Sequence, residues 1–78
     1  MITAPVFKPK GHYLTAEGYP LGTTCWYTVV EHRGYVFYCC GPTPAVAAER
    51  GKIMEELIDQ DKTYEMLKSQ LEEWRPAP

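Results

Sequence analysis

Three cysteines and two histidines are the side chains of this chain that could form a cysteine–histidine zinc site or a nucleophile–base pair. A zinc site would need Cys25, one of Cys39 and Cys40, and either His12 or His32. Cys39 and Cys40 are adjacent in a stretch that predicts a strand, so their side chains should point to opposite faces and not share one ion. The C-x-x-C spacing of structural zinc sites is absent. We therefore expect buried free thiols, with no metal and no cofactor.

Covalent catalysis would need a cysteine beside a general base. His32 lies next to a predicted hairpin turn, whereas Cys25 and Cys40 lie at the other end of the two strands, so the pattern disfavours such a pair. The chain has no glycine-rich phosphate loop, no serine nucleophile motif and no paired-histidine metal motif, and its only serine is Ser69. We predict that the protein is not an enzyme and has no catalytic residues.

The elements that must position any binding residue begin with an arm. Residues 1–11 contain Pro5 and Pro9, which bar a central strand and favour extended backbone. The segment 12–16 is a short candidate strand, and residues 17–22 are rich in turn formers. Residues 23–32 and 35–40 are dense in β-branched and aromatic side chains, which predicts two further strands. We expect these three strands to form an antiparallel meander over residues 12–40.

Arg33 and Gly34 lie in the turn between the two longer strands, where Gly34 can supply a positive φ. A two-residue loop would place Val30 opposite Phe37, and a three-residue loop would place Val29 there. Both registers leave apolar and aromatic side chains on both faces of the hairpin. Because one helical layer covers only one face, the second face is expected to be open to a partner unless the arm covers it.

Residues 43–75 predict helices. Thr43 is the expected N-cap, and Pro44 fits the first helical position. A polar stretch at 59–63 separates two apolar stripes, and Asp61 or Thr63 could cap a second helix that extends to Trp74. One long helix with a seven-residue rhythm is the alternative, which we favour less. The predicted fold class is therefore α+β, in the order β-β-β-α-α.

The 78 residues leave room for one domain, which we assign to 1–78. The composition, with 45% hydrophobic and 23% charged residues, is that of a globular protein. The longest strongly apolar run, residues 25–30, is far shorter than the roughly 20 residues of a membrane-spanning helix. The first residues lack a basic-then-apolar pattern, so we expect no leader peptide here. We expect a cytoplasmic protein that does not enter a membrane.

The acidic side chains concentrate in the helical half of the chain, residues 44–78, which contains eight acidic and five basic residues. A solvated helix face is the plain explanation. Alternatively, the residues 55–61 form an anionic ridge that docks on a basic surface of a larger complex, one that normally holds nucleic acid. The ridge comprises Glu55, Glu56, Asp59 and Asp61.

Direct binding of single-stranded nucleic acid is a second hypothesis, in which sheet aromatics stack bases and a few cations hold phosphates. The cations are few and the net charge is −2, which weighs against a polyanionic ligand. The stacking candidates are Trp26, Tyr27, Tyr35, Phe37 and Tyr38, and the cations are Lys8, Lys10 and Arg33.

The interpretation that we favour is a non-enzymatic protein–protein interaction module that inhibits or assembles a larger complex. Tyr, Trp and Arg are the residues that anchor interfaces. The predicted partner-binding residues are Trp26, Arg33, Tyr35, Tyr38, Glu55, Glu56, Asp59, Asp61 and Trp74. In size and layout the chain is similar to small phage-encoded proteins that block a host complex, anti-CRISPR proteins among them. A homodimer that pairs the open apolar surfaces is the remaining alternative.

Overall fold

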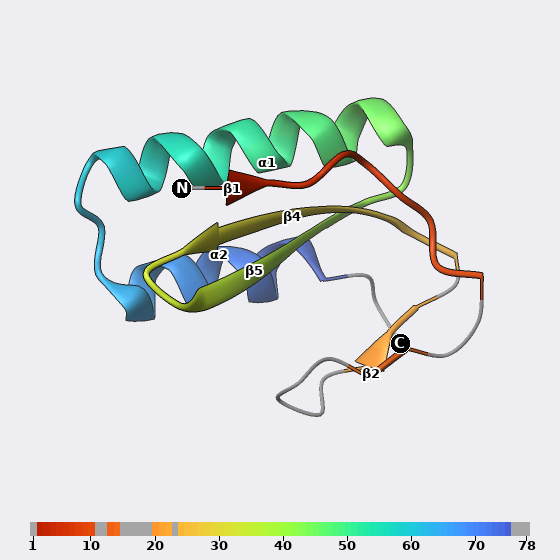
Figure 1. Cartoon of the computed structure of the whole chain (residues 1–78), viewed down its shortest axis with the longest axis horizontal. Coiled ribbons are helices and arrows are strands. Elements are labelled where there is room, and N and C mark those ends of the chain that lie inside the picture. The colour runs from red at the N-terminus through yellow and green to blue at the C-terminus, as the bar shows by residue number, and fades with distance from the viewer. Residues whose placement is uncertain (1, 11–12, 15–19, 23, 76–78) are drawn as a thin grey trace.

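A computed structural model describes residues 2–10, 13–14, 20–22 and 24–75 of the chain (Figure 1). The elements are, in order, β1 (Ile2–Thr3), β2 (Tyr13–Leu14), β3 (Pro20–Leu21), β4 (Trp26–His32), β5 (Tyr35–Gly41), α1 (Pro44–Asp59) and α2 (Tyr64–Trp74). A three-stranded antiparallel sheet is followed by two helices, which confirms the predicted α+β class.

The centre of the sheet is the β4–β5 hairpin, which has the register of a two-residue loop. Val30 pairs with Phe37 and Trp26 with Gly41 at the open end. Arg33 and Gly34 both have positive φ, 51° and 82°, as the tight hairpin turn requires. Of the two registers that the sequence allows, the structure therefore has the shorter loop.

The third strand of this sheet does not come from residues 12–16, so that part of the prediction is wrong. The arm supplies it instead: β1 pairs antiparallel with β4, with Ile2 opposite Glu31, which gives the strand order β1-β4-β5. An edge position suits a proline-containing segment, because an edge strand can lack one set of ladder bonds. Within 12–16, only Tyr13–Leu14 are described, and they pair with β3. His12, residues 15–19 and Thr23 lie outside the described residues.

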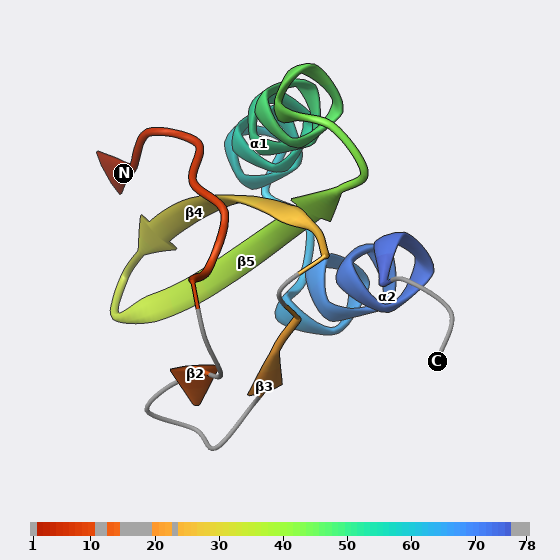
Figure 2. The same cartoon turned by 90° about the vertical axis from the view of Figure 1, so that its right-hand side faces the viewer.

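Helix α1 lies across one face of the hairpin (Figure 2). Thr28 of β4 is buried there, and its hydroxyl donates to the carbonyl of Ala47 at 2.8 Å. The helix comes this close because Gly51 has no side chain at the contact. A Cβ on Gly51 would lie 3.0 Å from the Cβ of Thr28 and closer still to its Cγ2 methyl. Further along the same face, Met54 packs in the main core.

The two predicted helices are separate, with the break where the polar stretch predicted it. Thr43 caps α1 by accepting from the amide of Val46, and Thr63 caps α2 by accepting from that of Met66. Asp61, in the connection, has a φ of 56°. Helix α2 then runs beside β5, on the side away from β1 (Figure 2). Neither helix in the described part of the chain has the length and apolar character needed to cross a membrane.

The second face of the hairpin is covered at its open end. Tyr27 and Cys40 are buried there with Leu21 and Cys25, and Phe7 of the arm packs against them. Farther toward the turn, three side chains of this face stay half-buried among the described residues: Val29, Val36 and Tyr38. The arm itself follows the edge of β4, where the backbone groups of Phe7 and Tyr27 exchange two hydrogen bonds.

Candidate functional site

A surface cavity of about 230 Å³ lies at the turn end of the sheet. The β4–β5 hairpin, the α1–α2 connection and the start of α2 border it. We call it the turn-end pocket. Its lining residues are His32, Arg33, Tyr35, Phe37, Ile58, Asp61, Lys62, Tyr64 and Leu67. Three of them, Phe37, Ile58 and Leu67, are buried core residues, so the pocket has an apolar floor.

Two tyrosines form the aromatic wall of the turn-end pocket. Tyr35 from β5 and Tyr64 from α2 have ring centroids 4.5 Å apart with a tilt of 39°. Phe37 completes the cluster, 6.4 Å from the ring of Tyr35 and 6.2 Å from that of Tyr64. The two tyrosines are nevertheless 51% and 41% exposed. Exposed aromatic rings held in a fixed arrangement supply contact area at low entropic cost.

The backbone is strained on both sides of this pocket. Arg33 and Asp61 are, within the described residues, the non-glycine residues with positive φ, and both line the cavity. A left-handed conformation costs an ordinary side chain about 1–2 kcal/mol, although aspartate tolerates it better than arginine. Such strain clusters at functional positions, which makes this pocket the leading candidate site.

The rim of the turn-end pocket carries charges of both signs. Arg33, Asp61 and Lys62 are all exposed. None of the three forms an ion pair with another residue that the structure describes. The side chain of Lys68 adds a further cation nearby, with Nζ 5.5 Å from the centre of the Tyr64 ring.

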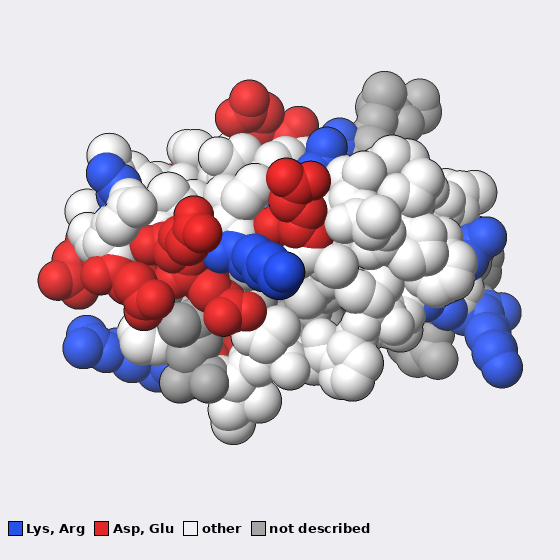
Figure 3. All heavy atoms as spheres, turned by 90° about the horizontal axis from the view of Figure 1, so that it is seen from above, with Lys and Arg blue, Asp and Glu red and all other residues white. Residues whose placement is uncertain are grey.

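The predicted anionic ridge begins next to the pocket, along the last turn of α1. Glu56, Asp59 and Asp61 are exposed, whereas Glu55 is half-buried and accepts a hydrogen bond from Thr3 at 3.0 Å. Figure 3 shows acidic side chains gathered over the end of α1 that leads to α2. Asp59 is the last residue of α1, whose last turn contains no basic residue. Negative charge at this end opposes the helix dipole, so these acids do not serve the stability of the helix.

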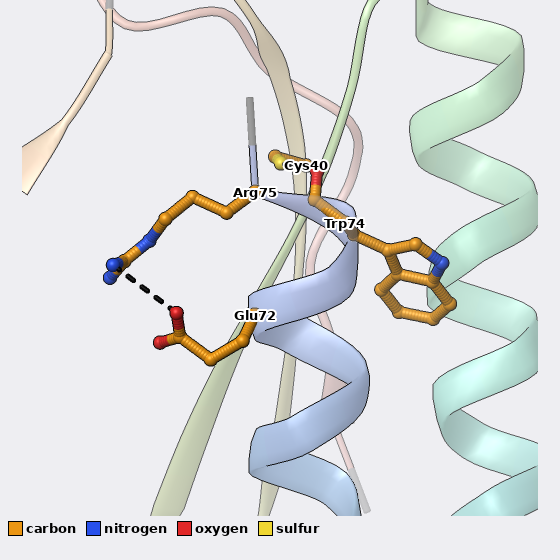
Figure 4. Close-up of polar contacts among 4 residues, drawn as sticks. All are labelled: Cys40, Glu72, Trp74 and Arg75. Carbon is orange, nitrogen blue, oxygen red and sulfur yellow. Dashed lines mark hydrogen bonds and ion pairs between the residues drawn. The ribbon is translucent and has the colours of Figure 1, made fainter. Parts of the chain in front are cut away.

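Three other predicted partner-binding residues, Trp26, Tyr38 and Trp74, do not line the turn-end pocket. Trp26 is at the opposite end of the hairpin, and Tyr38 is on the face of the sheet away from α1. Trp74, at the end of α2, points toward α1 (Figure 4). There the guanidinium of Arg50 lies 5.7 Å from its ring centre and donates to the carbonyl of Cys40 at 2.7 Å. Half-buried Trp74 therefore helps to fasten α2 to the rest of the fold.

The carboxyl end of α2 is held by its backbone as well. The thiol of Cys40 donates to the carbonyl of Trp74 at 2.9 Å. Arg75 turns the other way and pairs with Glu72 at 3.4 Å (Figure 4). This end of the molecule thus carries structural contacts, whereas Arg33, Tyr35 and Asp61 come together at the turn end.

The three cysteines are buried free thiols. Cys39 and Cys40 point to opposite faces, into two different core clusters, as predicted. Burial raises the pKa of the Cys39 thiol to about 12, and burial likewise raises the pKa of Cys40. Raised pKa values keep thiols protonated and unreactive. In the described part of the chain, no three metal-ligating side chains come together, and His12 lies outside it.

The aromatic side chains of the base-stacking hypothesis differ in their exposure. Of the five aromatics in that hypothesis, Tyr27 and Phe37 are buried, while Tyr35 is exposed. Among the polar and aromatic residues of the lining, Lys62 and Tyr64 belonged to no predicted site, and His32 was considered only as a metal ligand or a general base. The available signal was the position of Tyr64, which directly follows the N-cap Thr63. The first residue of a helix is less covered by neighbouring elements than residues farther along it.

No family model matches the chain, and no curated protein or solved structure matches it either.

Proposed function

We propose that this protein is a non-enzymatic binding module that forms a stoichiometric complex with a larger protein assembly. Its contact surface is the turn end of the molecule: the turn-end pocket together with the exposed acids of the anionic ridge. By occupying a basic surface of the assembly it blocks that surface, in the manner of the small phage-encoded inhibitors that it resembles in size and layout. The complex would form in the cytoplasm of the host.

The observation that carries this proposal is the convergence of strain and exposure at one cavity. Arg33 in the hairpin turn and Asp61 in the α1–α2 connection both have left-handed backbone conformations. Both line the pocket, whose aromatic wall is formed by Tyr35 and Tyr64. An asparagine or glycine at position 33 would serve the turn at lower cost. The arginine at this position supports a role in contact, since arginine and tyrosine are among the residues that dominate interface energetics.

The charge distribution supports the choice of a basic partner surface. Residues 55–62 contain four acids and one base. A negative potential at this end accelerates encounter with a positive surface and repels nucleic acid. The same charges would be unfavourable for direct binding of a polyanion, so the proposal favours a protein partner over DNA or RNA.

The test is affinity capture from a nuclease-treated host lysate, with the full chain as bait. The wild-type protein is compared with Arg33→Gln and with Lys10→Gln. Each variant removes one exposed positive charge, but Lys10 lies on the arm, away from the pocket. A second pair, Glu56→Gln and Glu49→Gln, removes one exposed acid from the ridge or from the first half of α1.

The proposal predicts one protein complex retained in stoichiometric amount by the wild type, Lys10→Gln and Glu49→Gln, with several-fold less retained by Arg33→Gln and Glu56→Gln. Circular dichroism should be the same for all five proteins. Equal retention by every variant would reject the turn end as the contact surface. In a parallel capture without nuclease, retention that appears only there would reject the protein partner.

A further inference from the structure

We propose that the turn-end pocket receives one aromatic side chain of the partner protein, with a carboxylate on or beside it. This inference rests on the proposed function and names the partner chemistry that the pocket recognises. The anchor would be a phenylalanine, tyrosine or tryptophan next to an aspartate, a glutamate or a chain-terminal carboxylate.

The size of the pocket indicates a single side chain. Its volume is about 230 Å³, below the ~300–1,000 Å³ typical of sites for small molecules and cofactors. A cavity of this size accommodates one large side chain, and anchoring of one partner residue in a formed pocket is how many interfaces gain most of their energy.

The walls and floor favour an aromatic body. Tyr35, Tyr64 and Phe37 form a three-ring cluster in which two rings remain exposed. A fourth ring would extend the cluster in a tilted or edge-to-face geometry, which adds to the energy of burying its area. Below it, Ile58 and Leu67 offer apolar contact without a buried polar atom that the anchor must satisfy.

The charges on the rim of the turn-end pocket indicate which polar group the partner's anchor carries. Arg33 and Lys62 are exposed cations without an ion-pair partner among the described residues, and Asp61 is the one acid of the lining. Lys68 already lies over the ring of Tyr64. The chain therefore supplies its own cation for this aromatic wall, and a partner cation in the pocket would meet two lining cations against one lining acid. A carboxylate is the complementary group.

The pocket that receives the anchor and the anionic ridge would together form a contact surface with one positive part and one negative part. The carboxylate of the partner would lie against Arg33 and Lys62, while its basic surface faces Glu56 and Asp59. Such an arrangement fixes the orientation of the complex, because a shifted register places like charges together.

The test uses small probes on the full, ¹⁵N-labelled chain, followed by NMR chemical-shift changes at Arg33, Lys62 and Tyr64. N-acetyl-L-phenylalanine presents the ring and the carboxylate, and N-acetyl-L-phenylalanine amide is the matched neutral probe. N-acetyl-L-arginine amide tests a cationic anchor, and adenosine monophosphate tests a nucleotide. The double variant Arg33→Gln/Lys62→Gln is compared with Lys10→Gln.

We expect the aromatic acid to bind about tenfold more tightly than its amide, as one charge-assisted contact would give. The double variant should remove this preference, and Lys10→Gln should leave it unchanged. Equal binding of acid and amide, tighter binding of the arginine or nucleotide probe, or no saturable shift up to about 20 mM acid would overturn the inference. Because these probes do not require the partner, such a result would leave the capture experiment to decide the proposed function separately.

Discussion

Gly51 of α1 lies directly against the side chain of Thr28 in β4, and this contact sets how closely the helix approaches the sheet. A β-carbon at position 51 would lie 3.0 Å from the Cβ of Thr28 and nearer to its methyl group. The same threonine donates a buried hydrogen bond to the carbonyl of Ala47. A glycine that weakens an isolated helix therefore permits the packing of this one.

Substituting Gly51→Ala should destabilise the protein, against the direction that helix propensity gives. Alanine would contribute about 1 kcal/mol as the better helix former, but overpacking costs about 1–3 kcal/mol. Urea denaturation should show a net loss. The companion variant Thr28→Ser removes the obstructing methyl and keeps the hydroxyl. The loss of unfolding free energy in the double variant should therefore be smaller than the sum of the losses in the two single variants. Simple additivity would contradict the contact.

Substituting Arg33→Asn should raise stability and weaken partner capture. Asparagine adopts the left-handed conformation of this turn position more readily than arginine, and the gain should be about 0.5–1 kcal/mol. Thermal or urea unfolding measures it. The neighbouring Gly34→Ala is the opposite control: nothing lies within 4 Å of the added methyl, so the expected loss of stability comes from the backbone at φ 82° alone. A stabilised variant that retains the partner fully would argue against a binding role for Arg33.

Asp59→Asn should also stabilise the fold, by about 0.3–1 kcal/mol at low ionic strength, because it removes a negative charge from the carboxyl end of a helix dipole. The gain should disappear in roughly 1 M salt. Glu49→Gln serves as the matched control, because Glu49 lies outside the first and last turns of α1. An equal change in stability for Asp59→Asn and Glu49→Gln would show that the position of the acid relative to the helix end does not cause the gain.

The buried thiol of Cys39 should make stability fall in alkaline solution. Its pKa is raised from 9.0 to about 12, so above pH 9 the unfolded chain loses this proton while the folded chain keeps it. The contribution is complete below pH 9 and is lost as the pH rises toward 12, at up to about 1.4 kcal/mol per pH unit. The Cys39→Ala variant removes this term, so its unfolding midpoint in urea should fall less steeply over the same range. Parallel curves would show that Cys39 ionises normally.

Local patterns predicted the secondary structure of this chain well. Thr43 with Pro44, and Thr63 after a polar stretch, are strong helix-start signals because each side chain satisfies an otherwise unpaired amide. Arg33 and Gly34 marked the hairpin turn. The third strand could not be predicted in the same way, because a two-residue edge strand such as β1 is defined by its partner β4 and not by its own sequence.

The site was only partly predictable for a related reason. Arg33, Tyr35 and Asp61 belonged to the predicted set, and the structure brings them to one cavity. Tyr64 had the spacing of a core residue in an amphipathic stripe, and its exposure depends on where α2 begins relative to β5. Trp26 and Trp74 are residue types that anchor interfaces, but burial at the other end of the fold depends on tertiary contacts that composition does not reveal.

The most direct test of the central claim is photo-crosslinking of the full chain in host lysate, with p-benzoylphenylalanine placed at Tyr64 or, as control, at Thr24. Both positions are exposed, and they lie at the turn end and near the opposite end of the hairpin. We predict a crosslink to one protein from position 64 and none from position 24, unaffected by nuclease. A protein crosslinked only from position 24, or no protein crosslink from position 64, would contradict the assignment of the turn end as the partner-binding surface.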